Sequence, residues 1–192
     1  VYVRVNRGVT KSLFLPLGAD GFYSPVDLDI TTTAGPGNVQ FGLRPVTEQH
    51  PTTVLDPLYS QLLLDYYWQM EGYVNWEAIS GSAVFTYQDP SMVKGGDDTG
   101  FSSAQFLADE NLWIKRTSGD GIDQSINEVA FDLEQWTISG TSNRIIDYSA
   151  GYTEDTDGTF YDAFPDTAPE YFSNSSGNWQ DLIWDKVPNL PG

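Results

Sequence analysis

The chain of 192 residues contains no cysteine and a single histidine. The absence of cysteine excludes disulfides, thiolate-bound zinc, iron–sulfur ligation and thiol catalysis. A lone histidine excludes every metal motif that needs two, and any Ser-His-Asp triad would depend on His50. Because His50 precedes Pro51 in a polar segment, we interpret it as an ordinary loop residue.

Basic residues and long apolar runs are also scarce. The chain has 9 Lys and Arg against 27 Asp and Glu, which gives a formal charge of −18 and a surface that repels nucleic acid and anionic membranes unless the charge is locally reversed. No segment approaches the roughly 20 apolar residues that span a bilayer, and the first residues lack a signal-peptide pattern. We therefore expect a soluble protein with neither a nucleic-acid partner nor membrane insertion.

The common catalytic motifs are missing as well. The sequence has no Gly-x-Ser-x-Gly elbow and no Gly-x-x-x-x-Gly-Lys phosphate loop. Gly35-Pro36-Gly37 is no dinucleotide fingerprint, because Gln40 stands where the third glycine belongs. We expect no enzyme; the one class left open is a glycosidase with two carboxylates ~5–10 Å apart, and the sequence singles out no such pair.

The residues that are present predict one domain over residues 1–192, rich in β-structure. Apolar residues make up 40% and aromatic residues 14%, which is enough for a core without metal or disulfide. Apolar and polar residues alternate over 26–31, and the segments 1–5 and 13–15 are expected to pair as a hairpin. Further strand candidates between turn-forming residues are 39–43, 81–87, 112–116, 128–139, 144–152 and 159–164. This spacing favours an antiparallel β-sandwich or jelly roll.

One segment has the spacing of an amphipathic helix. Asp56 and Pro57 suit a helix start, apolar residues recur at helical spacing, and Gly72 suits the end, so a helix is predicted over 57–71. Its apolar surface extends to Leu64 and Trp68, which is wider than one sheet needs. These two residues either fill a deeper part of the core or contact another subunit. A second short helix is predicted over 103–110.

Charge is distributed unevenly. Residues 1–50 carry four basic and four acidic side chains, so the remaining 142 residues carry the entire −18. Residues 1–11, with Arg4, Arg7 and Lys11, form a basic N-terminal strand or arm. Opposite potentials would steer such a segment to an acidic neighbour, either the body of the same chain or the next copy; the alternative is an edge strand with solvated charges.

An acidic segment offers ligands for a hard cation. The oxygen-bearing side chains that would hold calcium there are Asp155, Asp157, Thr159, Asp162 and Asp166. Calcium takes six to eight oxygen ligands, and acidic residues on a Gly-containing turn can supply several. The segment lacks the glycine and glutamate of an EF-hand loop, so the alternative is an acidic hairpin turn. Calcium is the one cofactor considered, and none is required.

Two functional classes fit these features. The first is a non-enzymatic structural or interaction subunit of a larger assembly, such as a virion capsid-associated, decoration or tail component. In that class the tail 173–192, with Trp179 and Trp184, packs on the body or on a neighbouring copy. The second is a carbohydrate-binding sandwich, in which exposed aromatic rings stack on sugars. The expected location is a virion or the extracellular space, and the excess of acidic residues suits saline surroundings.

Overall fold

The computed structural model describes residues 1–53, 63–94, 97–115, 121–133, 137–138, 141–142, 144–152 and 164. The acidic segment with Asp155, Asp157, Thr159, Asp162 and Asp166, and the tail 173–192 with Trp179 and Trp184, lie outside these residues. Within the described part no helix is long and apolar enough to cross a membrane.

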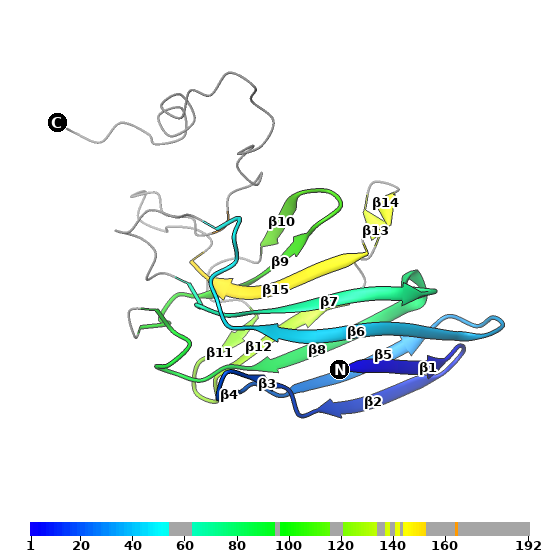
Figure 1. Cartoon of the computed structure of the whole chain (residues 1–192), viewed down its shortest axis with the longest axis horizontal. Coiled ribbons are helices and arrows are strands. Elements are labelled where there is room, and N and C mark those ends of the chain that lie inside the picture. Colours follow the sequence, from blue (N-terminus) through cyan, green and yellow to red (C-terminus); the bar gives the residue numbers. More distant parts are fainter. Residues whose placement is uncertain are drawn as a thin grey trace, which may run out of the picture.

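Two large antiparallel sheets form a sandwich-like body (Figure 1). The six-stranded sheet has the order β1 (Tyr2–Asn6), β6 (Asn38–Val46), β7 (Tyr67–Val74), β15 (Ile145–Gly151), β9 (Ser102–Leu107), β10 (Leu112–Lys115). The five-stranded sheet has the order β11 (Ile122–Asp123), β12 (Glu128–Asp132), β8 (Ile79–Thr86), β5 (Val26–Thr32), β2 (Thr10–Leu15). Small pairs are β3 (Gly18–Ala19) with β4 (Phe22–Tyr23), and β13 (Thr137–Ile138) with β14 (Thr141–Ser142). The mainly β prediction is confirmed, and the jelly-roll form stays a prediction.

The core lies between the two large sheets and follows the alternation of the sequence. In β5 the residues Val26, Leu28 and Ile30 are buried while the intervening side chains are exposed. The six-stranded sheet contributes large side chains from its inner face, among them Trp68 and Tyr148, which contact Phe85 of the opposite sheet. At about 1.5–3 kcal/mol for each large apolar side chain, this burial is the main stabilising contribution.

The helix predicted over 57–71 is wrong over its described part. Leu63 and Leu64 form isolated β-bridges, and residues 67–71 belong to strand β7. The physical reason is that both faces of β7 are covered at its start, because Tyr67 on the outer face and Trp68 on the inner face are both buried. The run 66–68 that leads into β7 therefore has no polar alternation, which begins only at Gln69 and Glu71, and a short apolar run does not distinguish a strand from a helix.

The short helix predicted over 103–110 is also wrong, for the same reason. Residues 102–107 form β9, in which all six residues are buried. β9 lies between β15 and β10 and is covered on both faces, so it is not amphipathic at period 2. Among the described residues the only helical element is the single 3-10 turn η1 (Trp76–Ala78).

The N-terminal strands do not form the predicted hairpin. β1 pairs with β6 in the six-stranded sheet, whereas β2 pairs with β5 in the five-stranded sheet. A turn around Gly8 carries the chain from one layer to the other, and Gly8 has a φ of 75°, which favours glycine. Each of the two strands is therefore the last strand of its own sheet, and the two sheets end side by side (Figure 1).

Candidate functional site

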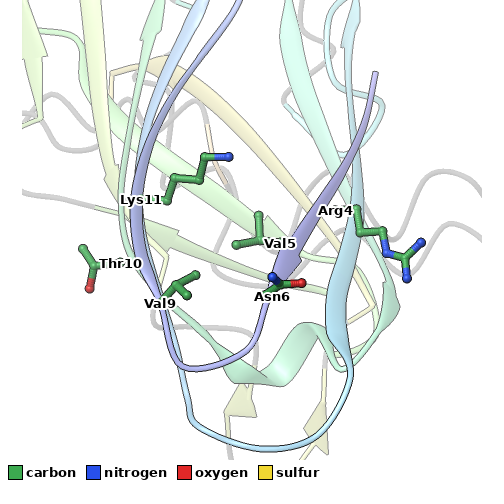
Figure 2. A pocket seen from close by; sticks show the side chains of 6 residues that line it. All are labelled: Arg4, Val5, Asn6, Val9, Thr10 and Lys11. Atoms are coloured by element: carbon green, nitrogen blue, oxygen red, sulfur yellow. The ribbon is translucent and has the colours of Figure 1, made fainter.

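The open edge of the sandwich, formed by strands β1 and β2, contains a cavity of about 260 Å³. Its lining comes from Arg4, Val5, Asn6, Val9, Thr10 and Lys11. Figure 2 shows Val5 on β1 and Lys11 on β2 pointing into the space between the two strands, whereas Arg4 and Thr10 point away from it. The cavity therefore has an apolar floor with an amino group at its side.

The backbone at the open edge is available for pairing. The main-chain nitrogen of Val1 donates to the Leu43 carbonyl, and the Leu43 N–H donates to the Val1 carbonyl. In an antiparallel pair only alternate residues bond in this way, so every second residue of β1, beginning with Tyr2, directs its N–H and C=O groups away from β6. The same alternation in β2 starts from the hydrogen bond between Val9 and Thr32. The Asn6 carbonyl accepts from Thr32 Oγ1 at 2.9 Å, and the other outward backbone groups of β1 and β2 have no backbone partner among the described residues.

Lys11 is the exception to the apolar inner face of β2. It is paired with the buried Ile30 of β5 and lies on the same face as Leu13 and Leu15, which pack on the core. Among the described residues no acceptor or carboxylate is bonded to its amino group. An inward-pointing lysine on an edge strand opposes pairing with an apolar strand.

Arg7 has a structural role in the turn between the two layers. Its Nε donates to the Thr33 carbonyl at 3.2 Å, and its Nη2 donates to Thr33 Oγ1 at 3.0 Å and to the Ala34 carbonyl at 3.3 Å. These bonds tie the turn to the segment between β5 and β6. Of the predicted basic group, Arg7 is therefore occupied by its own chain, while Lys11 faces the cavity.

A second feature lies on the outer face of the six-stranded sheet, where two tyrosines meet above a glycine. Tyr2 on β1 and Tyr73 on β7 come from strands on either side of β6, and their ring centroids are 5.3 Å apart at an interplanar angle of 42°. Tyr2 is paired with Gly42 of β6, and a Cβ at Gly42 would stand 3.1 Å from Tyr73 Cε2. The missing side chain at Gly42 thus lets the rings approach. We call Tyr2, Gly42 and Tyr73 the tyrosine platform.

The half-buried member of the platform is held in place by polar contacts. The Tyr73 hydroxyl donates to Glu71 Oε2 at 2.7 Å, and Glu71 Oε1 lies 3.1 Å from Arg144 Nη2. The guanidinium carbon of Arg144 lies 5.7 Å from the Tyr73 ring centroid. The hydrogen bond with Tyr2 and then the one with Glu71 raise the pKa of Tyr73, so its ring stays neutral. Tyr2 itself is 80% exposed, which is unusual for so large a ring.

Arginines lie on either side of the exposed Tyr2 ring. Arg4 follows two residues later on β1, and Arg44 lies two residues beyond Gly42 on β6, so each is about 7 Å from the Tyr2 position along the strand direction. Arg44 donates to Gln69 Oε1 through Nε at 3.0 Å and Nη2 at 2.6 Å. When the Asn38 side-chain amide is turned so that its oxygen faces Arg4, this oxygen accepts from Arg4 Nε at 3.2 Å and from Nη2 at 2.8 Å. Neutral amides thus hold both guanidinium groups.

A third feature of this face is a buried histidine–aspartate pair. His50 is 2% exposed, and its Nε2 lies 2.9 Å from Oδ2 of Asp147 on β15. The Thr52 N–H donates to His50 Nδ1 at 3.3 Å, so Nδ1 is the acceptor and Nε2 carries the proton that faces Asp147. Gln69 donates to Asp147 Oδ1 at 2.9 Å, and Trp113 Nε1 donates to Thr52 Oγ1 at 3.0 Å. One hydrogen-bond chain therefore crosses the sheet.

Aromatic rings enclose this pair. The His50 ring lies 4.8 Å from Tyr67, 4.9 Å from Phe106 and 4.8 Å from Trp113, measured between centroids. Burial, followed by the charge of Asp147, raises the pKa of Tyr67. Both nitrogens of His50 are engaged and the ring does not reach solvent, so the pair fastens the segment after β6 to the sheet and offers no general base to a substrate.

His50 thus lies in a loop, as predicted, but it is buried and bonded to Asp147, so its interpretation as an ordinary loop residue was incomplete. The sequence contained one relevant signal, since a lone histidine beside threonines and a proline can form a tight local turn. Its partner Asp147 is 97 positions away, and no spacing rule connects the two. Sequence reasoning also missed the tyrosine platform, because it depends on which strands flank β6.

The other predicted interaction residues are either buried in the core or outside the described part of the chain. Leu64 and Trp68 have no exposed area and belong to the core, so neither side chain contacts an outside partner in this structure. In the described part of the chain no group of three or more His, Asp and Glu side chains could hold a metal ion. The predicted calcium residues and the tail tryptophans fall outside that part.

Comparison of the chain with protein-family models, with curated proteins and with solved structures finds no match. The function is therefore inferred from the geometry of the open edge and of the two outer faces.

Proposed function

We propose that this chain is a non-enzymatic structural or interaction subunit that joins other copies of itself in a larger assembly. The observation that carries the proposal is the open edge between β1 and β2, where Lys11 borders a cavity of about 260 Å³ and has no partner among the described residues. A capsid-associated, decoration or tail component of a virion is the kind of assembly that this chain suits.

The same molecule offers the acidic surface that such an edge would bind. On the outer face of the five-stranded sheet Asp27, Asp29 and Asp132 are exposed and Glu128 is half-buried. Strands β5, β8, β11 and β12 contain no lysine or arginine. An acidic face and a basic edge are different surfaces, so their contact is heterologous and joins copies head to tail, in a closed ring or in an open series. Electrostatic attraction would steer the encounter and weaken with salt.

The test is native mass spectrometry combined with sedimentation velocity at low and high salt. We expect a concentration-dependent series of oligomers at low salt that shortens at high salt. Lys11→Glu should abolish the series, and Lys11→Arg should keep it, because the charge that meets the acidic face is retained. Lys115→Glu on β10, at the opposite edge of the six-stranded sheet, is the charge-matched control and should behave as the wild type. A wild-type monomer at low salt, or equal loss in the control, would overturn the proposal.

The tyrosine platform favours a second function, the binding of a saccharide.

A further inference from the structure

We propose that the tyrosine platform, together with Arg4 and Arg44, binds an anionic saccharide. This inference is independent of self-association, because it uses the outer face of the six-stranded sheet and not the cavity between the sheets. The ligand class is an oligosaccharide that carries carboxylate or sulfate groups.

The first step is the ring surface. Sugars stack their C–H faces on aromatic rings, and such a site needs a ring that is exposed and held in one orientation. Tyr2 supplies the exposed ring, at 80%. The Tyr73 ring on β7 packs against Tyr2. Tyr73 is held by its hydrogen bond to Glu71 and by the Arg144 guanidinium over its ring, and Gly42 leaves room for it. The tilt of 42° gives the ligand an angled surface in place of a flat one.

The second step is charge. This protein has 27 Asp and Glu side chains and 9 Lys and Arg side chains, so most arginines are expected to form an ion pair with a carboxylate. Arg4 and Arg44 are nevertheless held by the amide oxygens of Asn38 and Gln69, and no described carboxylate forms an ion pair with either. The amides orient the guanidinium groups without neutralising them. Their positive charge is thus left for a ligand, and arginine binds carboxylate and sulfate oxygens well.

The third step is the alignment of the two arginines with the Tyr2 ring. The order along the β1 and β6 edge is Arg4, Tyr2, Arg44, with about 7 Å between neighbours along the strand direction, so the two arginines are about 14 Å apart. This separation of the backbone positions suits a ligand longer than one sugar. The arrangement therefore fits a chain of sugars whose acidic groups flank the unit that stacks on Tyr2.

The proposal is tested by isothermal titration calorimetry with three probes of equal length: an oligogalacturonide, a sulfated oligosaccharide and an uncharged oligoglucan. We expect one or both anionic probes to bind and the uncharged probe to bind more weakly. The relative affinity of the two anionic probes distinguishes recognition of carboxylate from recognition of sulfate. Absence of binding by both anionic probes, or equal binding of the uncharged probe, would overturn the proposal.

Variants identify the surface. Tyr2→Ala should weaken binding about fivefold to tenfold, the loss expected for one stacked ring. Tyr2→Phe should retain most of the affinity. Arg44→Gln should weaken binding and reduce its salt dependence. Tyr23→Ala on β4 removes another exposed tyrosine, 51% exposed, and is the matched control with wild-type affinity.

Three results would contradict this assignment. Binding unchanged by Tyr2→Ala would reduce the interaction to general attraction between a polyanion and arginines. An equal loss in Tyr23→Ala would show that the platform is not the site. Loss of binding in Lys11→Glu, with Tyr2→Ala unaffected, would move the ligand to the open edge. Self-association can fail in its own test while saccharide binding persists, so the two proposals are separable.

Discussion

The buried pair of His50 and Asp147 gives the sharpest prediction about stability. Replacing His50 with phenylalanine preserves a ring of similar size among Tyr67, Phe106 and Trp113 but removes the donor to Asp147 Oδ2. The carboxylate, 5% exposed, would keep only the bond from Gln69. Removing the neutral N–H donor from a buried carboxylate costs about 1.5–3 kcal/mol, the value of a hydrogen bond to a charged group.

The companion variant Asp147→Asn isolates the contribution of that charge. Asparagine keeps the shape and a neutral oxygen for Gln69, so we expect a cost of about 1–2 kcal/mol, close to that of one buried hydrogen bond. In the double variant His50→Phe/Asp147→Asn no charge is left unpaired. Its cost should therefore be smaller than the sum of the single costs by about 1–3 kcal/mol, the usual coupling between contacting residues.

Urea denaturation followed by tryptophan fluorescence measures these free energies of unfolding. Constant m-values would show that the variants unfold to the same extent as the wild type. For a chain of this length, the His50→Phe cost corresponds to a melting temperature lower by about 3–12 °C. A cost below about 1 kcal/mol, or single costs that add within about 0.5 kcal/mol, would refute the view that the pair fastens the segment after β6 to the sheet.

Two further predictions concern pH and calcium. Burial raises the pKa of Tyr66, Tyr87 and Tyr148, and a hydrogen bond to Asp98 adds to the effect at Tyr87. The folded state therefore keeps these protons when the unfolded state loses them, so stability that is present below pH ~10 falls above it. Tyrosinate absorbance should rise together with unfolding measured by circular dichroism, and titration of these residues in the folded protein would contradict the burial. If the acidic segment 155–166 binds calcium, millimolar calcium should raise the melting temperature by mass action, and Asp157→Asn should abolish the rise; an unchanged melting temperature in the wild type would refute the site.

The β-class of the protein could be predicted from the sequence because one-sided burial leaves a period of two. Val26, Leu28 and Ile30 alternate with exposed residues, and β5 lies where that pattern predicts it. The missing cysteines likewise excluded disulfides and thiolate sites without any structure. These conclusions depend on composition and on local order along the chain.

The tertiary structure decided everything that depends on covering a second face or on pairing distant segments. β9 and the start of β7 lack alternation because other parts of the chain bury their outer faces, so the sequence pattern there resembled a helix. β1 and β2 are neighbours in sequence but belong to different sheets, since the turn at Gly8 changes layers.

The candidate sites depend on the same long-range pairing. Tyr2 and Tyr73 meet only because β6 runs between their strands and contributes Gly42 at that position. His50 and Asp147 meet across 97 positions. A sequence states which side chains are available; strand order and register determine which of them come within contact distance, because those are fixed by the burial of the whole core.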